Sequence, residues 1–179
     1  KVMWAELVKL RRPSLSVSTI AAVTFITGLV TSLLYLLVDS PTGNAREGTR
    51  ISREVLQLPS GLSLSFSNAA GLLGVVALCV FAAQTAQEYT YGTLRNLLVR
   101  QPRRLVLLMG KYAAMKVFAL LFAFINAVVS IAISVYLSDR AKVSTDLWFT
   151  SEGWSAIAHT FINVYISIVF YAIIGIALG

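Results

Sequence analysis

Few residues of this sequence have the type and spacing that catalysis requires. His159 is the only histidine and Cys79 the only cysteine. No acidic residue lies close to His159 in the sequence, and the Gly-x-Ser-x-Gly motif of a nucleophilic serine is missing. One histidine and one distant cysteine are too few ligands for a metal site. We therefore predict no catalytic residue and no metal ligand, and an enzyme that uses His159 stays as a rival hypothesis.

The pair Gly110-Lys111 looks like the end of a phosphate-binding loop. That motif also needs a glycine five residues before its second glycine, and Ser or Thr directly after the lysine. Leu105 and Tyr112 occupy those two positions. The motif is therefore incomplete, and any ATP hydrolysis would belong to another chain.

Polar side chains recur at helical spacing inside apolar stretches. Two roles fit them: hydrogen bonds between membrane helices, typically worth about 0.6 kcal/mol each, or the wall of a substrate path. Helix packing is the commoner role. No charged residue lies within the parts of these stretches that the stripes cover, which argues against an ion-coupled carrier. The stripes consist of Thr24, Thr27 and Thr31; of Asn126, Ser130 and Ser134; and of His159, Asn163, Ser167 and Tyr171.

The segment 88–111 is basic and lies between two apolar runs. Gly92 permits a sharp turn, and Thr93 is a suitable N-cap for a helix. Pro102 ends that helix because proline lacks an N–H and collides with the preceding turn. We predict a short amphipathic helix on the membrane surface, with Leu94, Leu97 and Leu98 on its apolar face and with Arg95 and Arg100 turned elsewhere. The cations Arg103, Arg104 and Lys111 follow this helix.

The elements that must position these residues are four apolar runs. The chain has 57% hydrophobic and 13% charged residues and a mean hydropathy of +0.76. Soluble domains carry about 25% charged residues, and a membrane-spanning helix needs about 20 apolar ones. We therefore predict an all-α membrane protein, a polytopic transmembrane helical bundle that forms one domain over 1–179. Its spans are expected at about 15–38, 69–87, 112–137 and 154–179.

The connections outside these spans are polar and mixed in charge. Ile51, Val55 and Leu58 fit one face of a short surface helix, whereas 62–66 alternates apolar residues with serine and fits either a strand or an interfacial loop. Trp148 and Trp154 fit an aromatic belt at the membrane surface. Small residues predict close helix contacts within the second and fourth spans. They are Ala69, Ala70, Gly71 and Gly74, together with the pair Gly175 and Gly179.

Residues 1–13 combine a helical period of apolar side chains with several basic residues. This pattern is typical of a helix in the membrane interface, where each basic residue gains about 1 kcal/mol from anionic lipid. A simple charged flank of the first span fits equally well. The residues assigned to the interfacial helix are Trp4, Glu6, Lys9, Arg11 and Arg12.

Orientation follows from the distribution of lysine and arginine, which favour cytoplasmic loops. Ten of them lie in the N-terminal flank and in 88–116, and five lie in the two other loops. We predict a multi-pass protein of the cytoplasmic (plasma) membrane, bacterial in origin, with both ends and the basic segment on the cytoplasmic side. This bias accounts for the net charge of +7 without nucleic acid as a partner.

The basic segment resembles the signature of the permease subunits of type-2 ATP-binding-cassette (ABC) transporters. The residues that carry the resemblance follow one another in the family's order, and 5–11 (Ala-Glu-Leu-x-Lys-Leu-Arg) is similar to the family's interfacial helix. The signature positions are Glu88, Gly92, Thr93, Leu94, Arg95, Asn96, Leu97, Leu98, Arg100, Pro102, Arg103, Arg104, Gly110 and Lys111.

The resemblance implies a six-span permease that pairs with a second copy or a homologue and with two ABC ATPase subunits. Segment 88–111 would then be the coupling segment that contacts the ATPase, and ATP and Mg would bind to that partner, with no cofactor in this chain. The chain would export an amphipathic or hydrophobic compound such as a drug, peptide or lipid. Four spans instead of six, and a first residue other than Met, suggest a partly recorded chain. The alternative is a non-transporting scaffold or sensor that binds anionic membrane lipids through its basic stretch.

Overall fold

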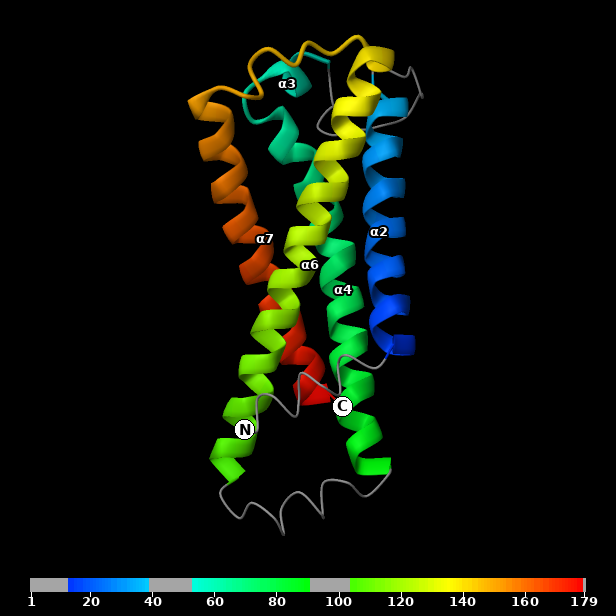
Figure 1. Ribbon diagram of the computed structural model, residues 1–179, viewed down its shortest axis with the longest axis vertical. Helices are drawn as coiled ribbons and strands as arrows, with labels where there is room; N and C mark the ends of the chain where they lie inside the picture. Colours follow the sequence, from blue (N-terminus) through cyan, green and yellow to red (C-terminus); the bar gives the residue numbers. More distant parts are fainter. Residues whose placement is uncertain (1–12, 39–52, 91–103, 179) are drawn as a thin grey trace, which may run out of the picture.

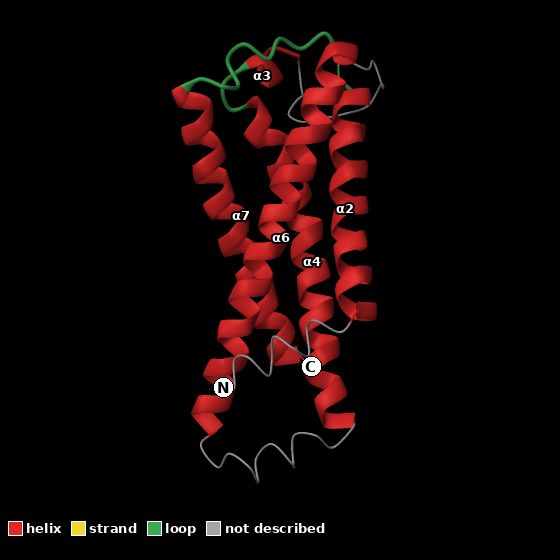
Figure 2. Cartoon of the chain, viewed as in Figure 1, coloured by secondary structure: helices red, strands yellow, loops and turns green. Residues whose placement is uncertain are grey.

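The computed structural model describes residues 13–38, 53–90 and 104–178. Within these residues the chain forms helices α2 (Pro13–Leu36), α3 (Arg53–Gln57), α4 (Gly61–Thr90), α6 (Arg104–Ala141) and α7 (Ser151–Leu178), as Figure 1 shows. No strand occurs in the described part of the chain (Figure 2). Every helix except α3 is long and apolar enough to cross a membrane. The predicted fold class, an all-α polytopic membrane protein, is confirmed.

The long helices run up and down through one bundle (Figure 1). The start of α2, the end of α4, the start of α6 and the end of α7 lie at the same end, the lower one in the figure. Helix α3 and the loop before α7 lie at the opposite end. The bundle therefore places the positions that flank segment 91–103, Thr90 and Arg104, at the end where α2 begins.

The stretch around 62–66, which the sequence left open, belongs to helix α4. Leu62, Phe66, Ala69 and Leu73 are all buried at helical spacing, so the apolar period of the span continues back to the start of the helix. The intervening serines are compatible with a helix because their hydroxyls bond to carbonyls one turn earlier. Ser65 Oγ donates to the carbonyl oxygen of Gly61 at 3.3 Å.

The third apolar run also extends beyond its predicted limits. The span was expected from Tyr112, but α6 begins at Arg104 and continues to Ala141. The added first turns are rich in leucine and other good helix formers, and Pro102 lies just ahead of them. The ends of the predicted coupling segment, 88–90 and 104–111, are therefore parts of α4 and α6.

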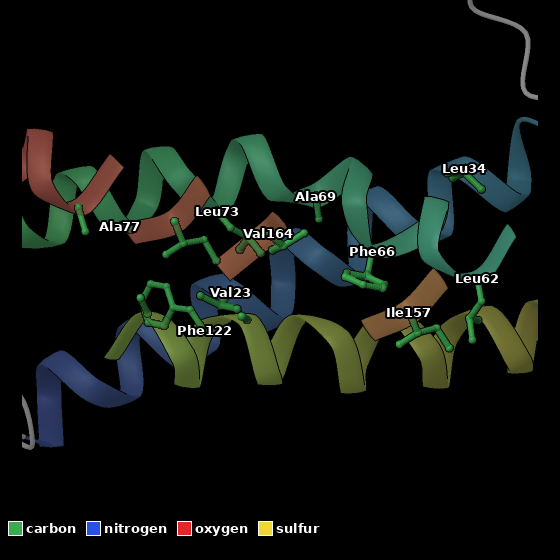
Figure 3. Packing of buried hydrophobic residues seen from close by; sticks show 14 of the residues in the cluster. Val23, Leu34, Leu62, Phe66, Ala69, Leu73, Ala77, Phe122, Ile157 and Val164 are labelled. Carbon is green, nitrogen blue, oxygen red and sulfur yellow. The ribbon is translucent and has the colours of Figure 1, made fainter. Parts of the chain in front are cut away.

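The core lies where the four long helices meet (Figure 3). Val23 of α2, Leu73 of α4 and Phe122 of α6 are fully buried, and Val164 of α7 is 3% exposed. The ring of Phe122 also contacts that of Phe118 in a tilted arrangement, with 4.8 Å between the ring centroids and 48° between the ring planes. These contacts hold the backbone positions from which the polar side chains project.

Helices α4 and α7 approach each other closely through two glycines. A Cβ atom added to Gly74 would lie 2.4 Å from the Tyr171 ring, and one added to Gly175 would lie 2.5 Å from the Leu78 carbonyl oxygen. Gly71, in contrast, has open space around it. The expected close contact therefore involves Gly74 and Gly175 but not Gly71.

At the end of the bundle opposite Thr90, Trp148 links the loop before α7 to helix α3. Its indole Nε1 donates a hydrogen bond to the carbonyl oxygen of Leu56 at 2.8 Å, and its side chain is fully buried. The assignment of Trp148 to an interfacial belt is therefore wrong, because the ring finds both apolar contacts and a hydrogen-bond acceptor inside the protein. Trp154 is 57% exposed, as a belt residue would be.

Candidate functional site: polar stripes of the spans and the basic end

A ladder of side-chain hydrogen bonds joins α2 to α6 inside the bundle. Thr27 Oγ1 donates to Asn126 Oδ1 at 3.0 Å, and the hydroxyls of Thr31 and Ser130 lie 3.3 Å apart. All four side chains are fully buried. Each rung is one helical turn from the other because both helices place these residues four positions apart.

Helix α4 also contributes hydrogen-bonding groups to this ladder. Asn126 Nδ2 donates to the carbonyl oxygen of Phe66 at 3.2 Å, so this amide uses both its acceptor and a donor. The Tyr35 hydroxyl lies 3.2 Å from Ser65 Oγ. Ser134, one turn beyond Ser130, is also fully buried. The arrangement is that of helix packing, since each rung bonds a neighbouring helix and none of these groups faces the outside.

Sequence reasoning did not identify Tyr35, Ser65 or the Phe66 carbonyl as members of this ladder. A signal for Tyr35 was present, because it follows Thr31 at the same spacing at which Thr31 follows Thr27. Ser65 is hidden in an alternating stretch whose secondary structure was undecided. Thr24, which was grouped with the first stripe, is exposed and stands apart from the ladder.

The polar stripe of α7 is divided by the structure. His159 and Asn163 are exposed, Ser167 is half-buried, and Tyr171 packs against Gly74 of α4. The reason is geometrical: a helix has 3.6 residues per turn, so residues four apart advance about 40° around it at each step. Over the three steps from His159 to Tyr171 the stripe winds from the outer surface to the interior.

The end of the bundle at Thr90 and Arg104 is formed by long helices. The 30 residues of α4 and the 38 of α6 correspond to lengths of about 45 and 57 Å. Both helices extend beyond the other two at this end (Figure 1). On α6, Gly110 is buried and Lys111 half-buried, and Lys116 Nζ lies 4.6 Å from the centre of the Tyr112 ring. This cation–π contact orients one of the basic residues.

Many of the predicted site residues lie outside the residues that the structure describes. Glu88 lies near the end of α4 and Arg104 is the first residue of α6, and only their backbone positions are given. The rest of the predicted signature, up to Gly110, and the whole interfacial helix lie outside the described residues. They are Gly92, Thr93, Leu94, Arg95, Asn96, Leu97, Leu98, Arg100, Pro102 and Arg103, and Trp4, Glu6, Lys9, Arg11 and Arg12.

Catalytic and metal-binding groups do not gather in the described part of the chain. No set of three or more His, Cys, Asp or Glu side chains there could hold a metal ion. Cys79 and His159 are both exposed and belong to different helices. What the described residues bring together is a membrane-spanning bundle with a bonded polar interior.

Comparison with known proteins identifies the chain at the level of its family. Neither the curated proteins nor the solved structures gave a match. A family model described as ABC-2 family transporter protein matches residues 2–178, which is nearly the entire sequence. The chain therefore belongs to the ABC-2 family of transporter membrane subunits, a group of membrane transport components.

Proposed function

We propose that this chain is the permease through which a separate ABC ATPase drives export of an amphipathic or hydrophobic compound. Membership of the ABC-2 family supports the permease role and, in general, an ABC ATPase as partner. ATP and Mg bind to that partner, because the Gly110-Lys111 pair lacks the other residues of a nucleotide-binding loop.

The observation that carries the proposal is the length of α6. Its uncharged part, Val117–Ser138, is about 33 Å long and matches a hydrocarbon layer of about 30 Å. Residues 104–116 add about 20 Å of the same helix on the basic side. A partner that pulls or pushes on the connection between Thr90 and Arg104 therefore acts on a continuous helix that enters the membrane.

The force would reach the interior of the bundle through the hydrogen bonds that α6 forms with α2 and α4. Helix α6 carries Asn126 and Ser130, which bond α2 and α4 within the membrane. A displacement of α6 at its basic end is thus transmitted to α2 and α4 as well. We propose that these helices respond to the ATPase as a unit and open the export path.

The proposal also includes the location and the orientation. The basic end carries most of the lysine and arginine of the chain, which supports a cytoplasmic position for the N-terminus and for the connection between α4 and α6. The membrane would be the plasma membrane of a bacterium. This placement brings the coupling segment to the side on which ATP is available.

The test is a double charge reversal, Arg95→Glu with Arg100→Glu. We expect loss of ATPase copurification and of vanadate-sensitive transport, because the coupling segment would no longer fit its partner. The control reverses two exposed cations at the opposite end of the bundle, Arg140→Glu with Lys142→Glu, and should leave both readouts unchanged. Survival of both readouts in the first variant would contradict the proposal. Binding to anionic vesicles with no ATPase in any preparation would favour the scaffold or lipid-sensor alternative.

A further inference from the structure

The hydrogen-bond ladder between α2 and α6 stops one rung short. Its two rungs join residues that are 99 positions apart, and the distance between the bonded oxygens grows from 3.0 Å in the first rung to 3.3 Å in the second. The same offset pairs Tyr35 with Ser134 as a third rung. Ser134 Oγ is fully buried beside the Tyr35 side chain, yet it has no hydrogen-bond partner among the described residues. The ladder thus widens toward the end of the bundle opposite Thr90, and its third rung is not formed.

Tyr35 uses its hydroxyl toward α4 instead. That hydroxyl lies 3.2 Å from Ser65 Oγ, and Ser65 Oγ donates its own hydrogen to the carbonyl oxygen of Gly61 at 3.3 Å. A hydroxyl carries one hydrogen, so the tyrosine is the donor to the serine. Ser65 therefore keeps its bond to Gly61 when Tyr35 turns away, whereas Ser134 gains a bond only when Tyr35 turns toward it.

Two arrangements of Tyr35 are therefore close in free energy. Its O–H donates to Ser65 in one and to Ser134 in the other, so the number of bonds that it forms is the same. The second arrangement also satisfies the hydroxyl of Ser134, and a buried hydroxyl without a partner costs free energy. Its opposing cost is a closer approach of α2 to α6. Opposing terms of this kind leave the less stable of two states measurably populated.

We propose that Tyr35 is a latch that ties the end of α2 either to α4 through Ser65 or to α6 through Ser134. The end of α2, the start of α4 and the end of α6 lie at the same end of the bundle, the upper one in Figure 1. In the arrangement seen here the latch holds α2 to α4. In the other, α2 closes onto α6 and its latch bond to α4 is released, so that α2 and α4 can part at this end.

The latch deepens the proposed function, on which its link to export rests. In the proposed orientation this end of the bundle faces away from the cytoplasm, so the exchange of Tyr35 precedes opening of the export path on that side. Asn126 lies two turns below the latch position on α6 and bonds both α2 and α4. These helices therefore still move together below the latch.

The first test is a set of unfolding measurements on the full chain in detergent. Ser134→Ala alone should leave the unfolding equilibrium nearly unchanged, because Tyr35 remains on Ser65. In a Ser65→Ala background the same change should favour unfolding about threefold, since Tyr35 then depends on Ser134. With Tyr35→Phe this dependence should vanish. The matched control is Ser138→Ala, one turn further along α6, where a buried hydroxyl bonds its own helix and should be indifferent to residue 65.

A second measurement asks whether the unmutated chain visits both arrangements. The chain has seven tyrosines, so fluorotyrosine replaces Tyr35 alone and is observed by fluorine NMR. We expect exchange with a minor environment populated at about 0.1–10%. Ser134→Ala should abolish the exchange, and Ser65→Ala should make the minor environment the dominant one. A single environment in all three chains would overturn the inference. Exchange that persists in Ser134→Ala, or an effect of Ser134→Ala on unfolding that is independent of residue 65, would overturn it as well.

The outcome is separable from that of the proposed function, because neither readout requires ATP. ATPase copurification and vanadate-sensitive transport are measured on the same variants. If transport is ATPase-driven and fluorine NMR shows one environment, the proposed function stands and the latch is wrong. If the exchange is present and no ATPase copurifies, the latch stands and the coupling role is wrong. Where both are present, Ser134→Ala should slow transport with ATPase copurification intact, and unchanged transport would overturn the link between the latch and export.

Discussion

Two spans of this protein carry polar residues at the same four-residue spacing and use them differently. On α6, Asn126, Ser130 and Ser134 are fully buried, and the first two bond neighbouring helices. On α7, His159 and Asn163 point away from the bundle. A polar stripe at this spacing therefore does not decide by itself where its side chains bond: on α6 the partners lie on α2 and α4, whereas on α7 no described residue forms a hydrogen bond with His159 or Asn163.

The largest expected effect concerns the half of α7 that does face inward. Gly175→Ala should destabilise the bundle by about 1–3 kcal/mol, because the new methyl group would collide with the backbone at Leu78. Gly71→Ala is the matched control and should change stability by less than about 1 kcal/mol, in the stabilising direction, since alanine is the better helix former. Unfolding in mixed detergent micelles measures both. Equal losses for the two variants would contradict the close contact of α4 with α7.

The next effect compares the two asparagines directly. Asn126→Leu should reduce the stability of the protomer by about 1–2 kcal/mol, since it removes the hydrogen bonds to Thr27 and Phe66. Asn163→Leu should leave the isolated protomer within about 0.5 kcal/mol of the wild type, because surface substitutions without internal partners have small effects. The measurement is detergent unfolding at protein concentrations at which the protomers are separate. A larger loss for Asn163→Leu would reverse the comparison.

The smallest effect tests one rung of the ladder. Thr31→Val keeps the shape of the side chain and removes the hydroxyl that lies beside Ser130, which should cost about 0.6 kcal/mol. Thr24→Val makes the same chemical change at an exposed position of α2 and should be nearly neutral. The same unfolding assay compares the two variants. If both are neutral, the ladder contributes little to stability and serves chiefly to align the helices.

Some elements could be predicted from the sequence because local composition decides them. The spans are recognisable from runs without charge. The basic segment, in which Gly92 and Thr93 precede the predicted helix and Pro102 ends it, indicated the family that the match to residues 2–178 establishes. The limits of α4 and α6 were less predictable. Their polar or mixed ends at 61–68 and 104–111 are not apolar enough to be counted as span, yet the helix continues through them.

The role of Trp148 shows a second limit of sequence reasoning. A tryptophan near the end of a span is most simply an interfacial residue. Its burial depends on the position of the Leu56 carbonyl, which lies far away in the sequence and is brought close only by the packing of α3 beside the loop before α7. No local pattern contains that information.

By itself the sequence determined that the chain is a membrane protein, which segments cross the membrane, and which end of the bundle is basic. These properties depend on the hydropathy and charge of consecutive residues, and a helix in lipid satisfies its own backbone. Only the tertiary structure decided which polar side chains meet. The interior of a span is distinguished from its outer face by the neighbours of each helix, and a four-residue repeat winds from one to the other. Thr27 and Asn126 thus share a hydrogen bond inside the bundle, whereas His159 and Asn163 lie exposed on α7.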